Sequence, residues 1–249
     1  MQIGAQLFTV RDFCKDLDSF SETLKKIADI GYKNVQVSGT CEFEAEWLKN
    51  ELNKNGLNCV ITHTPPVKLN SDIDKVIRDH EIFGCNHIGF GWQEFKLEAY
   101  DDTPKGWIEK YSPIAKKIKE SGKLFMYHNH DQEFKKVDGK LIIEHLADNF
   151  APDEMGFTLD TFWVTAGGGD PAQWCEKLSG RIPVIHLKDF SYGKKMAVVG
   201  EGNINFDRVF KCAEASGTKY MLVEQDDCNG ENPFDCLARS FKYLKSCGF

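Results

Sequence analysis

Residues 155–188 read MGFTLDTFWVTAGGGDPAQWCEKLSGRIPVIHLK and hold one complete strand–helix–strand unit. The apolar run Met155–Asp160 predicts a strand, and Arg181–His186 predicts the next. Between them, Asp170-Pro171 has the pattern of a helix N-cap followed by proline in the first turn. Both predicted strands end on a polar side chain. A β–α–β unit of this kind indicates parallel strands whose polar ends share one edge.

The same alternation repeats along the whole chain. We expect strands at Gln2–Phe8, Asn34–Ser38, Asn58–His63, His87–Phe90, Lys123–His128, Met155–Asp160, Arg181–His186 and Lys219–Glu224. We expect helices at Ser19–Ile30, Glu42–Asn55, Ser71–Phe83, Pro104–Ser121, Leu141–Asn149, after Asp170-Pro171, and at Phe206–Ser216 and Pro233–Ser246. Eight such pairs in 249 residues predict an α/β fold, a (β/α)8 TIM barrel, as a single domain over residues 1–249. An open doubly wound sheet would show a glycine-rich turn after its first strand, and Gln6–Arg11 contains none.

Composition and charge limit the partners. No apolar run approaches the roughly 20 residues that cross a bilayer, and the net charge is −7. A chain this acidic has no general attraction for nucleic acid or an anionic membrane. We therefore expect a small-molecule substrate, with no nucleic-acid or membrane partner, and the composition is compatible with a homo-oligomer.

Nine cysteines are scattered along the chain, and no pair has C-x-x-C spacing. An odd number in a chain of this length argues against a disulfide framework, and the spacing argues against a cysteine zinc site. Met1–Val10 has neither a basic region nor a long apolar core, so no signal peptide is expected. Free thiols in a reducing compartment and the missing signal predict a cytoplasmic protein.

Polar and aromatic side chains follow the later predicted strands, and in a TIM barrel such strand ends form the active-site mouth. They are His63, Trp92, His128 with His130 and Glu133, Asp160 with Trp163, His186 with Lys188, and Glu224. A buried carboxylate costs free energy unless it is paired or bound to a metal. Carboxylates and imidazoles that converge on one mouth therefore point to a divalent cation.

Several of these residues have a simpler interpretation. Asp160 could cap a turn, and His186 could be a hydrogen-bonded core histidine. His128 and His130 alternate in sequence and share one face of an extended segment, so one could be a ligand and the other a wall residue. Glu224 is harder to explain as a structural residue, because glutamate is rarely buried without a partner.

The remaining candidates would contact the substrate. Trp92 and Trp163 are either packing residues or flat surfaces for the C–H face of a sugar. Arg11 and Lys188 are either contacts to substrate oxygens or solvated surface cations.

The chain resembles the sugar phosphate isomerase/epimerase family of xylose isomerase-like TIM barrels. The motifs that carry the resemblance are Gly4–Arg11, Tyr127–Asp131, Leu159–Trp163, His186–Asp189, Gly200–Gly202 and Val223–Asp226. The resemblance implies one divalent cation, held by an acidic residue after strand five and by Asp160, His186 and Glu224 after strands six to eight. It does not specify a substrate, since the family includes ketose 3-epimerases, hydroxypyruvate isomerase, inosose dehydratase and endonuclease IV-type nucleases.

The strand-five position departs from the family pattern. Strand five ends at His128, and Glu133 follows five residues later, so either side chain could supply the ligand. The family's 3-epimerases use two glutamates on opposite faces of the substrate, and only Glu224 matches that pattern here. His128, His130 or Glu133 would have to be the second base.

These residues predict a metal-dependent isomerase or epimerase that removes a proton next to the carbonyl of a sugar or keto-sugar and passes through an enediolate. Glu224 is the expected base, with His128 or Glu133 as the other catalytic group. The expected substrate contacts are His63, Trp92, His130, Trp163, Lys188 and Arg11. The expected metal ligands are His128, Glu133, Asp160, His186 and Glu224, and Mn, Mg, Co or Zn would suit them.

Three alternatives stay open. A keto-sugar or keto-inositol dehydratase or lyase would use the same metal site, and the His-x-His end of strand five favours it slightly. A metal-dependent abasic-site nuclease is disfavoured by the charge of −7. The third alternative is a sugar-binding barrel that catalyses no reaction.

Overall fold

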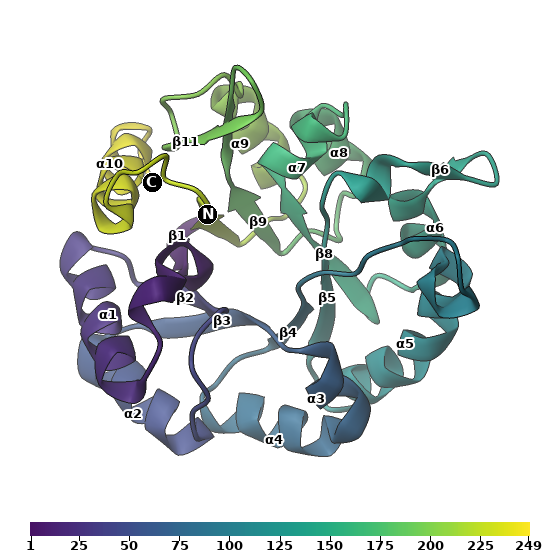
Figure 1. Ribbon diagram of the computed structural model, residues 1–249, viewed down its shortest axis with the longest axis horizontal. Helices are drawn as coiled ribbons and strands as arrows, with labels where there is room; N and C mark the ends of the chain where they lie inside the picture. The colour runs from purple at the N-terminus through teal and green to yellow at the C-terminus, as the bar shows by residue number, and fades with distance from the viewer.

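The computed structural model describes residues 1–249 and shows a closed barrel of eight parallel strands surrounded by helices (Figure 1). The barrel strands are β1 (Gln2–Gln6), β2 (Asn34–Val37), β3 (Asn58–His63), β4 (His87–Phe90), β5 (Leu124–His128), β8 (Met155–Asp160), β9 (Val184–Leu187) and β12 (Tyr220–Val223). They follow one another around the barrel in sequence order, and β12 pairs with β1 to close it. This confirms the predicted TIM barrel.

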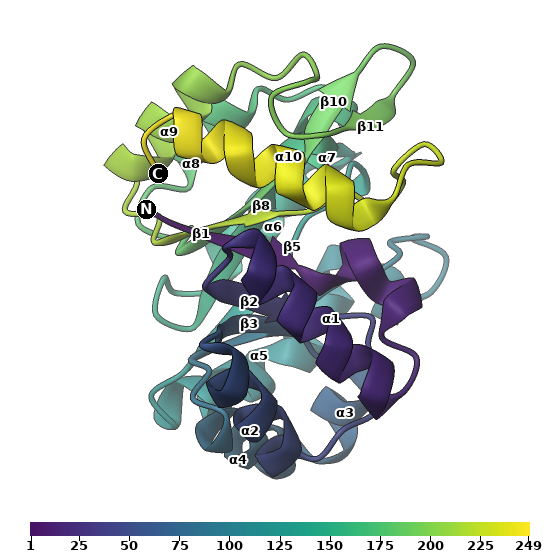
Figure 2. The same cartoon turned by 90° about the vertical axis from the view of Figure 1, so that its left-hand side faces the viewer.

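Helices cover the outside of the barrel. They are α1 (Leu17–Ile30), α2 (Ala45–Asn55), α3 (Pro66–Ser71), α4 (Ile73–Ile82), α5 (Pro104–Glu120), α6 (Ile142–Asn149), α7 (Thr161–Ala166), α8 (Pro171–Lys177), α9 (Phe206–Ala215) and α10 (Pro233–Ser246). Three short 3-10 helices, η1 (Leu7–Phe13), η2 (Tyr100–Asp102) and η3 (Gln132–Phe134), lie between them. The two chain ends lie close together at one end of the barrel (Figure 2). No helix combines the length and the apolar character that a bilayer crossing requires.

Helix starts follow the sequence signals. Asp170 accepts hydrogen bonds from the backbone N–H groups of Ala172 and Gln173, and Pro171 stands in the first turn of α8. Asp16 and Ser19 cap α1 reciprocally, each side chain bonding the backbone of the other. Such caps satisfy N–H groups that a helix leaves without intrahelical partners.

Several boundaries differ from the expectation, among them the start of β9 at Val184 instead of Arg181 and of α2 at Ala45 instead of Glu42. The first strand ends at Gln6 rather than Phe8, because the Gln6 side chain accepts a hydrogen bond from the N–H of Phe8 and starts η1. The helix expected at Ser71–Phe83 is α4, which Asp72 caps at Lys75, and an additional short helix, α3, begins at Pro66 and ends just before it. Proline at the first helical position supplies a preset φ and needs no N–H partner.

Several short elements lie outside the eight expected strand–helix pairs. The antiparallel pairs β6 (Lys136–Val137) with β7 (Lys140–Leu141), and β10 (Asp189–Ser191) with β11 (Lys195–Ala197), form hairpins outside the barrel. Helix α7 follows β8 directly. The β10–β11 hairpin stands at the end of the barrel away from the chain termini, where the strands end (Figure 2).

A packed aromatic cluster supports the β4–β5 side of the barrel. Phe90, Trp107, Tyr111 and Tyr127 are all buried, and the Phe90 ring lies 5.3 Å from that of Trp107 and 4.9 Å from that of Tyr111. Edge-to-face contacts of this kind add about 0.5–1.5 kcal/mol to the burial of each pair. The strand ends above this cluster therefore stand on a rigid base.

Candidate metal centre

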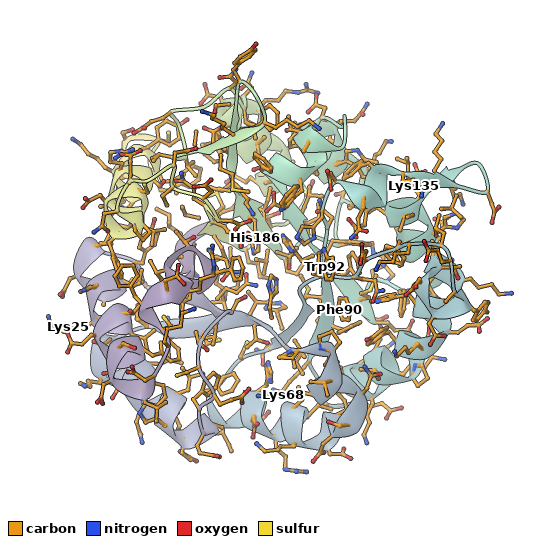
Figure 3. All side chains as sticks on the ribbon, viewed as in Figure 1. Lys25, Lys68, Phe90, Trp92, Lys135 and His186 are labelled. Atoms are coloured by element: carbon orange, nitrogen blue, oxygen red, sulfur yellow. The ribbon has the colours of Figure 1, made fainter.

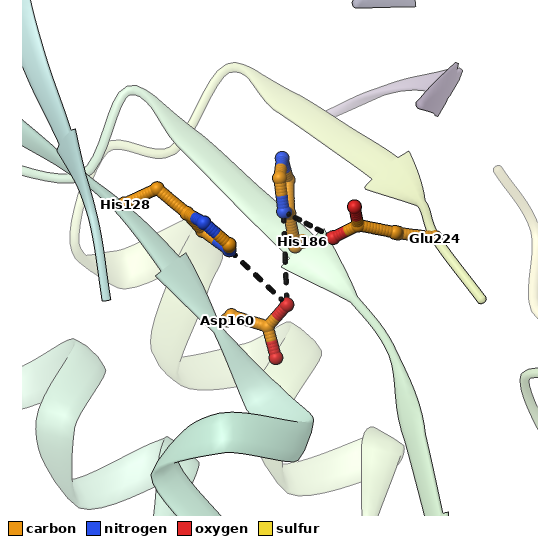
Figure 4. Close-up of side chains that lie close together, drawn as sticks. All are labelled: His128, Asp160, His186 and Glu224. Carbon is orange, nitrogen blue, oxygen red and sulfur yellow. Dashed lines mark hydrogen bonds and ion pairs between the residues drawn. The ribbon is translucent and has the colours of Figure 1, made fainter. Parts of the chain in front are cut away.

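Four buried side chains converge at the carboxyl ends of β5, β8, β9 and β12 (Figure 4). They are His128, Asp160, His186 and Glu224, and one ligand atom from each lies within 4.8 Å of all the others. The strand register explains the convergence, because Asp160 stands level with His186 across the β8–β9 pair. Figure 3 shows His186 near the barrel axis, whereas Lys25 and Lys135 lie at the outside of the ring of helices.

Gln36 orients the His186 ring. Nε2 of His186 lies 2.6 Å from Oε1 of Gln36, a carbonyl oxygen, so Nε2 carries a proton and donates it. In the neutral ring, Nδ1 then holds the lone pair, and it faces Oε2 of Glu224 at 2.8 Å. Fixing the tautomer of a ligating histidine through its other nitrogen is a common feature of metal sites.

His128 is oriented in the same way. Its Nδ1 lies 3.0 Å from the carbonyl oxygen of Gly91, which can only accept a hydrogen bond. Nε2 therefore holds the lone pair in the neutral ring, and it lies 3.4 Å from Oδ2 of Asp160. Both histidines present an unprotonated nitrogen to the same point when they are neutral.

Asp160 combines the two roles considered for it from the sequence. Its Oδ1 accepts a hydrogen bond from the N–H of Trp163 at 2.9 Å and so caps α7. Its Oδ2 faces the cluster, 3.7 Å from Nδ1 of His186. The Asn129 side chain fixes the backbone here by accepting from the N–H of Asp160 at 2.9 Å.

Lys188 places a buried positive charge beside the carboxylates. Its Nζ lies 2.6 Å from Oδ2 of Asp226, 3.5 Å from Oε2 of Glu224 and 3.8 Å from Oδ2 of Asp160. Burial alone would lower the pKa of Lys188, but these carboxylates outweigh it and raise that pKa above its usual range. The ammonium group stays charged at neutral pH.

The carboxylates respond to the same neighbours. Burial opposes ionisation of Glu224 and Asp160, yet Lys188 and the histidines hold the pKa of each well below its ordinary value. Burial lowers the pKa of His186, whereas the carboxylates of Glu224 and Asp160 raise it. Together they give His186 a pKa of about 9. A proton on His186 therefore partly balances the two carboxylates.

The donor set fits a divalent cation. Nδ1 of His186 and Oε2 of Glu224 are buried and face each other, but neither makes a hydrogen bond. With His186 protonated the two groups form an ion pair, and with His186 neutral a cation could bind both atoms in place of the proton. Two imidazole nitrogens and two carboxylate oxygens could hold Mn, Co, Zn or Mg.

Glu133 does not join these four side chains. Its Oε1 accepts from the hydroxyl of Tyr127 at 2.6 Å, and its Oε2 accepts from the N–H of His130 at 2.7 Å. Burial raises the pKa of Glu133 to about 7. The alternative in which Glu133 supplies the strand-five ligand does not match this geometry, because both oxygens already tie down the chain after β5.

Three predicted contact residues surround the cluster. The His63 ring lies 5.0 Å from that of His128, and the His130 ring lies 4.7 Å from it on a perpendicular plane. Nδ1 of His130 and Nε1 of Trp163 are buried without hydrogen-bond partners, and their rings are 5.1 Å apart. Burial lowers the pKa of His63 and of His130, so both are neutral imidazoles.

Trp92 and Arg11 are placed differently. Trp92 lies on the β4–α5 loop and is 55% exposed, the condition of a surface available to a ligand. The Arg11 guanidinium donates to the carbonyl oxygens of Phe8 and Asp226, the latter at 3.1 Å from each of two nitrogens. Arg11 thus holds the chain that follows Glu224, and its predicted contact to substrate stays a prediction.

Sequence reasoning missed four supporting residues. They are Gln36, Asn129, Asp226 and Asp189, of which Asp189 accepts backbone hydrogen bonds from Phe190, Gly200, Gly202 and Ile204. Gln36 had a usable signal, since a glutamine inside the strand Asn-Val-Gln-Val is polar where the core should be apolar. The supporting role of Asp189 left no signal in the local sequence, because three of its four partners are backbone N–H groups more than ten residues away.

Residues 24–247 match the model of the xylose isomerase-like TIM barrel family. The chain belongs to this family. It is 24% identical to an inosose dehydratase from Erwinia tasmaniensis over 92% of this chain and 90% of that protein. A structure of a sugar phosphate isomerase/epimerase from Parabacteroides distasonis superposes with a TM-score of 0.85 at 25% identity, covering 98% of this chain and 93% of the other.

A further structure has a similar barrel. The probable 3-DHS dehydratase AsbF from Bacillus anthracis superposes with a TM-score of 0.74 over 98% of this chain and 99% of the other, at 15% identity. That likeness concerns the fold. Together, the family match and the Parabacteroides structure confirm the resemblance found in the sequence motifs.

Proposed function

We propose that this protein is a metal-dependent enzyme that removes a proton next to the carbonyl of a polyhydroxylated ketone, after which the β-hydroxyl leaves as water. The observation that carries the proposal is Glu224, a buried ionised carboxylate that borders both the histidine–aspartate cluster and the ammonium of Lys188. A base, a fixed positive charge and a cation site within one small volume are what enolisation needs.

The divalent cation would be held by His128, Asp160, His186 and Glu224, and when bound it would act as a Lewis acid on substrate oxygens. Glu224 takes the proton from carbon, and the electron pair of that C–H bond moves toward the carbonyl oxygen. Lys188 faces the negative charge that develops there, because its Nζ lies within the same group of carboxylates. The protonated Glu224 then gives its proton to the β-hydroxyl as the C–O bond breaks. One water molecule leaves, the carbonyl re-forms, and Glu224 is again a carboxylate.

A site with a single carboxylate base favours elimination or isomerisation over epimerisation. A two-carboxylate epimerase needs a second base on the opposite face of the substrate, and Glu133 is occupied by Tyr127 and the N–H of His130. Elimination needs only one carboxyl group that first accepts and then returns a proton. The similarity to inosose dehydratases over nearly the whole chain supports the same choice.

Isomerisation is the second candidate. It differs after the enediolate has formed: Glu224 returns its proton to the former carbonyl carbon, and the proton of the neighbouring hydroxyl moves to the former carbonyl oxygen, so that the new carbonyl forms at the carbon that lost its hydrogen. The 25% identity to the Parabacteroides sugar phosphate isomerase/epimerase favours it.

The test is proton NMR of ketoses and a keto-inositol incubated in D2O with the Mn-loaded protein and quenched with chelator. We expect deuterium next to the carbonyl together with a dehydrated product. Deuterium in an isomerised product without loss of water would support the isomerase instead. If the metal-loaded protein binds these sugars but neither exchanges deuterium into them nor forms a product, the proposal is overturned, and a sugar-binding barrel is the remaining interpretation.

A further inference from the structure

A cavity of about 580 Å³ lies beside the candidate metal centre, between the segment after β2 and the segment after β3. Ser38 and Thr40 line it from the β2 side, and His63, Thr64 and Ser71 line it from the β3 side. Its volume falls within the roughly 300–1,000 Å³ of small-molecule sites. Protein interiors are otherwise close-packed, so a space of this size at the mouth of a barrel is available to a ligand.

The side chain of His63 lies between this cavity and the cluster. His63 lines the cavity, and its ring lies 5.0 Å from that of His128 and 5.8 Å from that of His186. Nδ1 of His63 lies 3.2 Å from Oγ of Ser38, and Nε2 is buried with no hydrogen-bond partner. A molecule that reacts at the cluster and extends past His63 would enter the cavity directly.

Strand β2 connects the two spaces as well. Gln36 binds Nε2 of His186, and Ser38, two residues later, lines the cavity. Val37 and Gly39 line the cavity as well, and Oγ of Ser38 lies 3.2 Å from Nδ1 of His63. The same strand end therefore forms part of both walls.

The charges on the cavity wall disfavour an anion. Its charged residues are Glu42, Glu44, Asp72, Asp79, Lys68 and Lys75, four carboxylates against two lysines, which leaves two formal negative charges. Both lysines are already paired, Lys68 with Glu42 and Lys75 with Asp79 at 2.7 Å. A phosphate group would meet no free cation there, and excess negative charge would repel it.

The uncharged part of the wall offers hydroxyl groups. Ser38, Thr40, Thr62, Thr64 and Ser71 all line the cavity. Ser38 bonds His63, Thr40 bonds the carbonyl of Cys41, and Thr62 bonds Thr64, so these four hydroxyls have only their remaining lone pairs or protons for a ligand, whereas Ser71 makes no such bond. Hydroxyls both donate and accept hydrogen bonds, and so they match the hydroxyls of a sugar or another polyol.

We propose that this cavity is a subsite for an uncharged, hydroxylated substituent such as a second sugar ring. It follows that the substrate is an extended, unphosphorylated ketone rather than a sugar phosphate. The proposal rests on the proposed function, because it assumes that the ketone end of the same molecule occupies the candidate metal centre.

The test compares ligands that share one ketose ring. Fructose, fructose 6-phosphate and three glucosyl or galactosyl fructoses of different linkage (turanose, lactulose and isomaltulose) are titrated calorimetrically into the Mg-loaded protein. Saturation-transfer NMR identifies which ring protons touch the protein. We expect the best disaccharide to bind about tenfold more tightly than fructose, the effect of one or two added hydrogen bonds. Fructose 6-phosphate should bind no more tightly than fructose.

Two variants fill the cavity from opposite walls. Thr40→Trp and Ser71→Trp should reduce disaccharide affinity to that of fructose and remove the NMR signal of the second ring, while fructose affinity is unchanged. Ser179→Trp is the matched control, because Ser179 is exposed and lies outside the cavity. Unchanged melting temperatures establish that the variants are folded.

The outcomes separate this proposal from the proposed function. Disaccharides that bind no better than fructose, second-ring contacts that survive in both tryptophan variants, or tighter binding of fructose 6-phosphate would each overturn the subsite. If the expected binding order holds but no ketone exchanges deuterium, the proposed reaction fails and the subsite stands. If exchange occurs with the wrong binding order, the subsite alone fails.

Discussion

Nδ1 of His186 and Oε2 of Glu224 face each other at 2.8 Å, inside the barrel, without the geometry of a hydrogen bond. The opposite ring nitrogen is held by Gln36, so the ring cannot turn away. Without a cation, a proton on His186 offsets the charge of the carboxylates. A metal ion at this point would take the place of that proton, and this exchange has measurable consequences.

The first consequence is proton release. Burial and the carboxylates of Glu224 and Asp160 together set the pKa of His186 at about 9, so the ring is protonated at pH 7 in the metal-free protein. Metal ligation requires neutral imidazole. We expect about one proton released per Mn bound at pH 7, measured by calorimetry in two buffers of different ionisation enthalpy. Binding without proton release would remove His186 from the ligand set.

The same pKa predicts the pH dependence of stability in chelator-treated protein. The folded-state pKa of His186, about 9, lies above its ordinary value of 6.5. Its contribution to stability is therefore complete below pH 6.5 and is lost as pH rises through 9. His186→Gln should weaken this decline in the metal-free protein, as followed by urea unfolding at several pH values. An identical decline in wild type and variant would contradict the assignment.

A separate prediction concerns Gln36. Gln36→Leu leaves the Nε2–H of His186 without an acceptor and no longer fixes the tautomer, so metal affinity should fall about 10–100-fold. Gln6→Leu is the matched control. Gln6 is also buried and stands level with Gln36 on the neighbouring strand, but it bonds the N–H of Phe8 instead of a ligand. Competition titration against a chelator measures both variants, and equal losses would show only general damage to the barrel.

Another prediction separates the two strand-five candidates. His128→Ala should lose metal affinity, whereas Glu133→Gln should keep it, because only His128 faces the cluster. Elemental analysis after dialysis against Mn measures this directly. If Glu133→Gln loses metal and His128→Ala keeps it, the ligand assignment is reversed.

Glu133 should instead affect stability. Burial raises its pKa from 4.5 to about 7, so the folded state binds its proton more tightly than the unfolded state. Stability is then lost as pH rises from about 4.5 to 7 and is constant above that range. Comparison with Glu133→Gln should show a pH-dependent difference on the order of 3 kcal/mol across this window. A difference that does not change with pH would mean that Glu133 ionises normally.

The sequence predicted the barrel because each β–α unit carries its own local signals. Met155–Asp160 and Pro233–Ser246 agree with the structure to the residue. Asp160, His186 and Glu224 were predictable as a set, because parallel strands bring their ends to one mouth. Glu133 was not, because its position depends on the hydroxyl of Tyr127 and on a turn at His130, and neither leaves a mark in sequence spacing.

The additional helix α3, which lies before the helix expected at Ser71–Phe83, shows a second kind of limit. Pro65-Pro66 predicts a break, and in the structure Pro66 also starts a helix. Proline permits both outcomes, and tertiary packing decides between them. The cavity beside His63 was equally hidden, since it depends on how α3 and α4 stand away from the segment after β2.

The last prediction concerns Glu224→Gln. Glutamine keeps the size of the side chain but has neither the negative charge nor the basicity of the carboxylate. His128, Asp160 and His186 remain, so the variant should bind Mn less tightly but still load at saturating metal. A general base contributes roughly 10²–10⁴ in rate, and solvent deuterium exchange into the ketone should fall by that factor.

The fold of this variant should survive. Glu224 follows the last residue of β12, and Asp160 and Asp226 remain beside Lys188 when its charge is removed, so the variant should lose some stability and stay folded. Asp226→Asn is the comparison variant, because Asp226 pairs with Lys188 at 2.6 Å but is not among the four ligands. It should keep metal affinity and lose less exchange than Glu224→Gln. Full exchange in metal-loaded Glu224→Gln would move the base to His130, and a collapse in melting temperature would instead make Glu224 a structural carboxylate.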